Sequence, residues 1–445
     1  MNGDMRQNLS AWGRLSATAS RYWSAKTYET VQEAIAAAGH RGAIARGLAR
    51  SYGDACLNDQ GSVIDLRPLS RIIHFDPVTG AVQCEAGVSF AALMQKFLPM
   101  GLIPATCPGT AMVTMGGAVA NDVHGKNQHG VGCFGDHLDW IDLVTPDGKI
   151  RRLSNLSEPD LFYATVGGIG MTGVIVALQF RLMRAPSNAM LLQECRVADL
   201  DGFLDALITN EPKYPYAVGW IDAMSQGAHL GRGILELASP SDIGISVPKK
   251  HIIRVPFDLP SCVLNRYTVA AFNELYFRRV PVTGRERLIH VNSFLYPLDS
   301  IRNWNRLYGR RGVYQFQCVI PFEEARKGIC RVLEEAARSR GASFLAVIKT
   351  MGRGGLGPLS FAMPGCTLAL DFPRCKETHA LVLRLQNIAL DHGGRVYLAK
   401  DACLPADRLP SMYPRLNEFL EVLRAIDPEA RMQSDMSRRL KLNLR

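Results

Sequence analysis

The stretch at 108–127, PGTAMVTMGGAVANDVHGKN, decides the fold of this chain. It holds four glycines, and the pair Gly116-Gly117 stands near its centre. Because glycine has no Cβ, a backbone built this way can approach a bulky partner closely. Small residues follow, and then a polar cluster of Asn121, Asp122, His124, Lys126 and Asn127. This order suits a flat, partly apolar cofactor along the backbone with reactive groups at one end; a glycine-rich surface loop is the alternative.

A second glycine-rich stretch lies earlier, at 46–54, and reads RGLARSYGD. Gly47 and Gly53 frame a tight turn whose backbone N–H groups can form an anion-binding nest, and Arg46 and Arg50 add positive charge. The stretch lacks the Gly-Lys-Ser/Thr ending of a Walker loop and the glycine spacing of a Rossmann turn. It is therefore a candidate pyrophosphate loop of a different fold.

These two stretches, together with GGIGMTG at 167–173, resemble the vanillyl-alcohol-oxidase or PCMH-type FAD-binding fold. The match is closer still to one family within that fold, the decaprenylphosphoryl-β-D-ribose 2-oxidases. It continues in the same order through WID at 220–222, YPLD at 296–299, FQCVIP at 316–321, LSF at 359–361, YLAKD at 397–401 and SDMSRRL at 434–440. The resemblance covers nearly the whole chain from about residue 41 onward.

The resemblance implies an α+β protein with two domains. Residues 1–187 are expected to form a PCMH-type FAD-binding domain, and residues 188–394 a substrate-binding domain with an antiparallel sheet flanked by helices. Residues 395–445 are expected to return to the FAD-binding domain. Local patterns agree, because short strands and helices alternate to about residue 183 and Pro186 is a plausible boundary.

Several segments carry a local signature of their own. Helices are expected at 28–38, 90–97, 322–340 and 378–392, strands at 62–66 and 81–86, a hairpin at 140–153, and an ordered arm at 1–24. The uncharged stretch at 161–180 contains GGIGMTG, so it predicts a helix end, a turn and a buried strand rather than a membrane span. The GRGGLG loop at 352–357 is either a flexible cover over a substrate opening or a surface loop.

The composition sets further bounds. At 445 residues the chain is long enough for two domains with full-sized cores. Its formal net charge of +10 favours anionic partners, such as a phosphate-bearing cofactor, a lipid phosphate or an acidic membrane surface. The basic residues are scattered and do not alternate with aromatic ones, so nucleic acid is not expected as a partner.

The cysteines indicate the compartment. Eleven of them occur singly at irregular spacing, which argues against a disulfide framework or a structural zinc and suits a reducing environment. No metal site is predicted. The first residues lack the apolar core of a signal peptide. We therefore expect a cytoplasmic protein without a transmembrane helix, and a peripheral position at the inner face of the plasma membrane stays open.

The resemblance also assigns residues to the cofactor. Arg50 occupies the place where some proteins of this fold carry the histidine that bonds covalently to FAD, which implies noncovalent FAD here. The residues expected to contact FAD are Arg46, Gly47, Leu48, Ala49, Arg50, Ser51, Tyr52, Gly53, Asp54, Gly109, Thr114, Met115, Gly116, Gly117, Asn121, Asp122, His124, Ile175 and Tyr397.

Three residues are candidates for catalysis. Lys400 follows an apolar run and precedes Asp401, so burial and a neighbouring carboxylate can tune its charge. The resemblance implies that Lys400 faces the flavin and the reacting carbon. His124 and Lys126 follow the flavin-binding glycines, where they would support flavin charge and meet a substrate phosphate or oxygen. A surface lysine and a structural histidine are the alternatives.

The substrate pocket implied by the resemblance consists of Tyr52, Trp220, Tyr296, Gln315, Gln317, Lys349, Thr367 and Ala369. Two of these depart from the family pattern, because mycobacterial members carry Asn and Cys where this chain has Thr367 and Ala369. The wall of the pocket therefore differs, which leaves the exact lipid and sugar open.

The resemblance implies an FAD-dependent enzyme that oxidises the 2-hydroxyl of a ribose carried on a polyprenyl phosphate. The 2-keto product would pass to a separate short-chain reductase, and the two steps together would turn ribose into arabinose for the cell envelope. Two alternatives stay open: a soluble alditol or aldonolactone oxidase on the same fold, and a flavin-binding scaffold that partners a reductase without turning over substrate.

Overall fold

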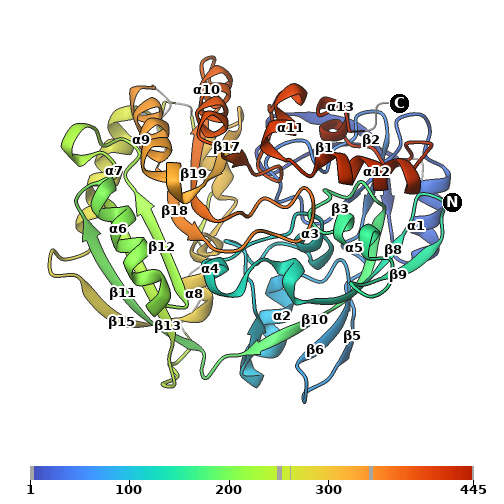
Figure 1. Cartoon of the computed structure of the whole chain (residues 1–445), viewed down its shortest axis with the longest axis horizontal. Coiled ribbons are helices and arrows are strands. Elements are labelled where there is room, and N and C mark those ends of the chain that lie inside the picture. Colours follow the sequence, from blue (N-terminus) through green and yellow to red (C-terminus); the bar gives the residue numbers. More distant parts are fainter. Residues whose placement is uncertain (1–4, 248–252, 261, 340–343, 443–445) are drawn as a thin grey trace.

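The computed structural model describes residues 5–247, 253–260, 262–339 and 344–442 (Figure 1). Its first sheet has the order β1(Met5–Ser10), β2(Ala17–Ser24), β4(Ser62–Asp65), β3(Ala43–Arg46). The last three of these strands run parallel, and α1(Tyr28–Ala36) connects β2 to β3. The expected arm at 1–24 is thus largely two paired strands, and its first four residues lie outside the described part of the chain.

A second, antiparallel sheet is built around one long buried strand. Its order is β5(Ile72–Phe75), β6(Ala81–Glu85), β10(Val174–Arg184), β8(Leu138–Val144), β9(Ile150–Leu153), and β7(Leu102–Pro104) also pairs with β10. The chain reaches β10 from α5(Pro159–Thr165) through the GGIGMTG turn, as predicted for the uncharged stretch. No described helix is long and apolar enough to cross a bilayer.

The third sheet has eight strands, and every neighbouring pair in it is antiparallel. Its order is β15(Arg285–His290), β11(Ala189–Val197), β13(Gly233–Pro240), β12(Tyr216–Ile221), β18(Ala346–Met351), β19(Gly365–Pro373), β17(Val313–Ile320), β20(Arg395–Val396). Three amphipathic helices cover one face: α6(Leu200–Asn210), α9(Phe322–Arg338) and α10(Thr378–Asp391). The α+β class with two domains is thereby confirmed, and Figure 1 shows the large sheet on the left of the molecule.

The opposite face of the large sheet meets the two smaller sheets and a short outer layer. That layer contains α7(Arg266–Arg278), α8(Val291–Leu295) and the parallel pair β14(Ile253–Arg254) and β16(Ile301–Arg302). Phe203 of α6 would collide with a Cβ at Gly219 on one side of β12, whereas Trp220 packs at 4.8 Å on Tyr276 of α7 on the other side. The sheet is therefore covered on both faces, and polar residues on the second face must find partners there.

The last part of the chain crosses back to the first two sheets. Arg395 and Val396 still pair with β17, so the crossing lies after Val396. The helices α11(Leu409–Met412), α12(Leu416–Ile426) and α13(Asp435–Arg439) then lie over the earliest strands, as the red helices in Figure 1 show. A bridge between Ala43 and Met432 fixes this return.

Candidate active site

The loop at 47–51 has free backbone donors. None of its five N–H groups donates a hydrogen bond to any residue in the described part of the chain. Ala49 adopts a left-handed conformation with φ of +53°, a position where non-glycine residues are uncommon and often functional. Successive N–H groups that turn inward around such a residue make an anion-binding nest. These residues therefore fit the pyrophosphate of FAD.

Contacts on both sides hold this loop in place. A Cβ at Gly47 would lie 2.2 Å from Thr114 Oγ1, and one at Gly53 would lie 1.9 Å from the carbonyl oxygen of Asp401. Both glycines are therefore required by close packing. Two residues assigned to FAD bind protein groups instead, because Arg46 donates to the carbonyl of Ser10 and Asp54 pairs with Arg439. Their side chains hold the loop in its shape, and the groups that could bind an anion are the backbone N–H groups.

The glycine pair at 116–117 belongs to a helix, α3(Met115–Ala120), which the sequence analysis did not predict because glycine is a poor helix former. Thr114 caps it, and its first three N–H groups donate to Val88 O, Ala86 O and Thr114 Oγ1. The side chain of Met115 is fully buried in the core. The backbone N–H groups of Met115 and Gly116 are therefore already used in hydrogen bonds. The side chain of Met115 is also not accessible to the cofactor.

Three buried polar atoms in the cluster after α3 have no partner among the described residues: Asn121 Oδ1, His124 Nδ1 and Asn127 Oδ1. His124 Nε2 lies 3.1 Å from Gln317 Nε2, and an amide nitrogen can only donate, so with this amide orientation the neutral ring carries its proton on Nδ1. Burial, Lys349 and Lys400 hold the pKa of His124 well below its usual value. A buried N–H donor without a partner in the protein is expected where the polar edge of a bound ring accepts its hydrogen bond.

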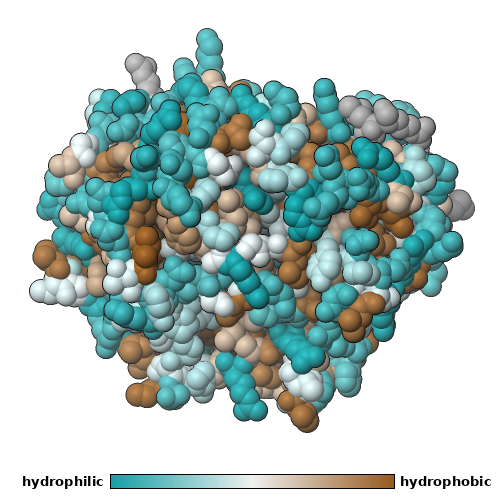
Figure 2. Space-filling view, viewed as in Figure 1, coloured by the Kyte–Doolittle hydropathy of each residue, from teal (hydrophilic) through white to brown (hydrophobic). Residues whose placement is uncertain are grey.

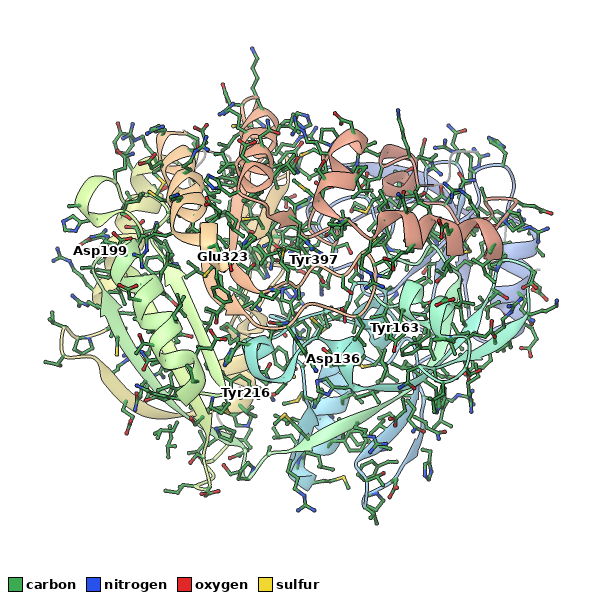
Figure 3. All side chains as sticks on the ribbon, in the orientation of Figure 1. Asp136, Tyr163, Asp199, Tyr216, Glu323 and Tyr397 are labelled. Atoms are coloured by element: carbon green, nitrogen blue, oxygen red, sulfur yellow. The ribbon has the colours of Figure 1, made fainter. Side chains whose placement is uncertain are left out.

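An aromatic group surrounds His124 where the two halves of the molecule meet. Its ring lies 5.0 Å from Tyr397 and 5.3 Å from Phe361, and these two stack at 4.8 Å. Tyr397, which Figure 3 labels near the centre of the molecule, donates its hydroxyl to the carbonyl of Asn121. This gives the site a flat apolar wall beside the polar atoms.

The expected pocket residues on the large sheet share one face. Trp220, Val347, Ala369 and Gln317 form a row across β12, β18, β19 and β17. Lys349 and Thr367 form the next row, and Gln315 pairs with Asp371 on the other side. Since strand residues alternate between faces, these side chains point to the side away from α9 and α10.

Lys400 lies at this face beside the loop. Its Nζ is 4.4 Å from the ring centre of Tyr52, whose backbone N–H donates to the carbonyl of Ala399. Burial lowers the pKa of Lys400 to about 8, assisted by Arg50 and opposed by Asp371. An amine with this pKa is partly neutral near neutral pH and can accept a proton.

The other two lysines are held by protein groups. Lys349 donates to the carbonyl of Gly125, and burial lowers its pKa to about 7. Lys126 reaches the same face of the large sheet as Lys349, at the part formed by β13. It donates to the carbonyl of Phe294 at 2.7 Å and lies 3.6 Å from Glu236 on β13. Lys126 therefore ties the chain after α3 to the large sheet.

Sequence analysis missed Asp371. This carboxylate is fully buried on β19, where Gln315 donates to it and the hydroxyl of Tyr308 lies 3.4 Å from its Oδ2. Burial raises its pKa, and Lys400 opposes that shift. The signal was present, because Asp371 lies two and four residues after Ala369 and Thr367 on the same face of a strand.

Four further candidates lie away from this cluster or are fully engaged. Ile175 packs inside the core from β10. Asp122 is buried, accepts from Ser360 Oγ and Gly135 N, and has a pKa that burial raises to about 6. The Trp220 indole donates to the carbonyl of Phe344. Tyr296 is buried near Cys107, and its hydroxyl has no partner among the described residues.

The loop at 352–357 is packed rather than open. A Cβ at Gly355 would lie 2.4 Å from Asp122 Oδ2, and one at Gly357 would lie 1.8 Å from the carbonyl oxygen of Val166. The loop thus runs from β18 onto the FAD-binding half, which favours neither of the two sequence interpretations. It is a fixed bridge between the two halves.

Comparisons with known proteins agree with this geometry. The family model described as an FAD binding domain matches residues 19–154. A protein of Mycolicibacterium smegmatis named decaprenylphosphoryl-beta-D-ribose oxidase is 37% identical over 98% of this chain and 98% of its own length. This chain belongs to the decaprenylphosphoryl-β-D-ribose oxidase family. Membership in this oxidase family makes it an FAD-dependent oxidoreductase and confirms the resemblance drawn from the sequence.

More distant relatives of this oxidase-family chain are less similar or cover less of it. An uncharacterised protein from Streptomyces coelicolor is 29% identical over 80% of the chain and 100% of its own length. Cytokinin dehydrogenase 3 of Arabidopsis thaliana is 26% identical over 34% of the chain and 29% of its own length. Similarity to the oxidase of Mycolicibacterium smegmatis extends over nearly the whole chain, whereas similarity to the cytokinin dehydrogenase covers about a third of it.

Proposed function

We propose that this protein oxidises the 2-hydroxyl of a polyprenylphosphoryl-β-D-ribose to a ketone with FAD as the electron acceptor. The observation that carries the proposal is the position of Lys400, which lies over Tyr52 next to the nest-forming loop and is close enough to Asp371, on the sheet face of Gln317 and Ala369, for the two charges to interact. A proton acceptor, a pyrophosphate nest and a polar sheet face are thereby brought to one place.

Bound FAD would supply the hydride acceptor of this reaction. Lys400 takes the hydroxyl proton, because its lowered pKa leaves part of it neutral near neutral pH. Gln315 and Gln317 offer amide groups that orient sugar hydroxyls. His124 would donate from Nδ1 to bound flavin, and Lys349 would add positive charge beside His124. We infer noncovalent binding, since the loop offers Arg50 where a covalent bond would need a histidine.

The cationic surroundings support a phosphorylated substrate. Arg50 lies 4.1 Å above the Trp12 ring at the edge of the loop, and its pKa is lowered mainly by burial. A half-buried guanidinium with unused donors binds a phosphate more strongly than an exposed one. The ketone product is reactive, so the proposal includes a short-chain reductase that consumes it. The proposal also includes a location at the cytoplasmic face of a membrane.

The test is an anaerobic absorption spectrum of the purified flavoprotein before and after addition of polyprenylphosphoryl ribose. We expect loss of the visible flavin band. A band that stays unchanged with this substrate but disappears with an alditol or an aldonolactone would replace the proposed substrate. A purified protein that does not bind FAD at all would overturn the assignment of FAD as its cofactor.

The matched variant is Lys400→Met, which keeps the length of the side chain and removes the amine. We expect it to retain FAD and to reduce its flavin at least about 100-fold more slowly, in the range that general base catalysis contributes. Lys376→Met, in the exposed turn before α10, is the control and is expected to behave as the wild type. Equal rates for the two variants would remove Lys400 from the mechanism.

A further inference from the structure

A continuous run of aromatic rings leads away from the proposed reaction site. It starts at Trp12 beside Arg50 and continues through Trp304, Tyr308, Phe344, Phe272, Tyr276 and Trp220. Neighbouring ring centres lie between 4.8 and 6.1 Å apart. Tyr52, the ring under Lys400, packs in the same cluster as Trp304 and Tyr308. Most of these rings are buried or half-buried and pack on one another, so they connect the region around Trp12 to α7 as solid core.

The run passes through Phe272 and Tyr276 of α7, whose outer face is apolar. Tyr267, Ala271 and Leu275 follow one another at four-residue spacing, so they form a stripe along the helix. The side chains of Tyr267 and Leu275 are 77% and 73% exposed, and Phe272 beside them is 45% exposed. The opposite side of α7 is anchored, because Asn273 donates to Asp222. On the face of the molecule in Figure 2, apolar residues are scattered among polar ones.

The segment at 253–260 extends the same surface. Ile253 and Phe257 are 64% and 63% exposed. This segment pairs with 301–302, and Leu264 just before α7 packs against the cluster that contains Trp304 and Tyr308. The segment and α7 are thus both attached to the cluster of Trp304 and Tyr308, and we name their exposed apolar residues together the α7 surface.

Exposed arginines lie on the segments that carry these apolar residues. Arg254 follows Ile253, Arg266 precedes Tyr267, and neither has an ion pair among the described residues. The nearby carboxylates are already paired, since Asp258 pairs with Arg14 and Arg310, and Glu274 pairs with Arg232 and Arg278. A hollow of about 340 Å³ beside Tyr308 is lined in part by Arg311. Exposed apolar residues next to positive charge are what an anionic lipid surface complements.

We propose that the α7 surface docks on a bilayer that contains anionic lipids. This inference rests on the proposed function, because the lipid tail of the substrate is what would place the substrate in a bilayer. Docking on the bilayer would let the tail stay in an apolar environment while the sugar reaches the site.

The test is co-sedimentation of the full-length flavoprotein with phosphatidylcholine vesicles with and without phosphatidylglycerol. We expect binding to the anionic vesicles that weakens with salt. The double variant Tyr267→Gln/Leu275→Gln is expected to bind at least about 10-fold more weakly, since it removes two exposed apolar anchors. The control Val78→Gln/Leu156→Gln changes two residues that are 89% and 91% exposed in the FAD-binding half, and it is expected to bind as the wild type.

A second readout separates this inference from the proposed function. Flavin reduction by a short, water-soluble farnesylphosphoryl ribose is expected to be equal in the wild type and the α7 double variant, whereas reduction by a long-chain substrate held in vesicles is expected to fall in the variant. Vesicle binding that is the same for wild type and variant overturns the inference and makes a protein the candidate partner for α7. Absence of reduction by either substrate overturns the proposed function instead.

Discussion

Lys400 and Asp371 are two oppositely charged groups that share one buried environment. Gln315 on the neighbouring strand donates a hydrogen bond to Asp371, and the amine of Lys400 lies over the ring of Tyr52. Burial disfavours the charge on each, and each favours the charge on the other. The position of Asp371 therefore sets how readily Lys400 gives up and takes back its proton.

The pH dependence of flavin reduction tests this pairing. Lys400 must be neutral to accept the hydroxyl proton, so the rate is expected to rise with pH around an apparent pKa of about 8. In Asp371→Asn the carboxylate no longer raises the pKa of Lys400. The rise is therefore expected at a lower pH, by about one unit or more.

The measurement is the rate of anaerobic flavin reduction by saturating substrate between pH 6 and about pH 10. Asp201→Asn is the matched control, because Asp201 is an exposed carboxylate that pairs with Arg326 far from the site. A profile that stays in place for Asp371→Asn would show that Asp371 does not act on Lys400.

At the scale of elements, the bridge at 352–361 joins the large sheet to the FAD-binding half. Ser360 Oγ donates to the buried carboxylate of Asp122 at 2.6 Å, next to the helix that carries the glycine pair. Asp122 itself has a left-handed backbone, with φ of +40°. One hydrogen bond therefore secures both the bridge and a strained turn.

Ser360→Ala removes that bond. We expect the free energy of unfolding to fall by about 1–3 kcal/mol, because a buried acceptor loses its donor. The pKa of Asp122 in the fold is already raised to about 6, so the carboxyl favours folding at low pH and this contribution is lost as the pH rises through that value. Ser360→Ala is expected to raise the pKa of Asp122 in the folded protein further. The loss in free energy of unfolding is therefore expected to be larger at pH 8 than at pH 5.

Urea denaturation at the two pH values checks this expectation. Ser70→Ala, an exposed serine with no hydrogen bond to the described residues, is the control and is expected to change stability by less than about 0.5 kcal/mol. A loss in free energy of unfolding that is equal at pH 5 and pH 8 would contradict the role given to the Asp122 carboxylate.

The elements that could be predicted are those with a strong local period. The helices from 28, 90, 322 and 378 begin where expected, and the hairpin forms around Gly148, whose φ is +84°. The helix α3 was missed because its two glycines disfavour a helix and only close packing on Ala86 requires them. The strands β1 and β2 were missed because apolar residues do not alternate in their sequences, and the residues that β2 buries first are the polar Thr18 and Ser20.

The candidate site was harder to predict for a different reason. A resemblance gave most of its residues, but the partners of each side chain come from distant parts of the chain. Glu236 holds Lys126, and Arg439 holds Asp54. Neither pair has a local signal, since the residues lie more than a hundred positions apart. Asp371 alone could have been found by counting along its strand.

At the scale of the whole molecule, positive charge gathers around a phosphate-binding centre. The chain carries a formal net charge of +10, and Arg50, Lys349 and Lys400 lie at or beside the centre itself. Such a field attracts an anionic substrate from a distance and is screened by salt.

Ionic strength therefore tests the charge of the natural substrate. The second-order rate constant for flavin reduction by a phosphorylated ribose substrate is expected to fall about threefold or more between 0.02 and 0.2 M salt. The limiting rate at saturating substrate is expected to stay constant, because the chemical step is shielded from the solvent ions. A second-order constant that does not change with salt would argue for an uncharged substrate.

The pairing of Asp54 with Arg439 also bears on when the protein can acquire its flavin. The two residues are 385 positions apart, and Arg439 also binds Asp401 and the carbonyl of Leu404. A ribosome delivers the nest-forming loop long before it delivers the side chain that closes that loop, so cofactor uptake has to wait until synthesis is nearly finished. Nascent chains that stop before α13 are accordingly expected to emerge colourless.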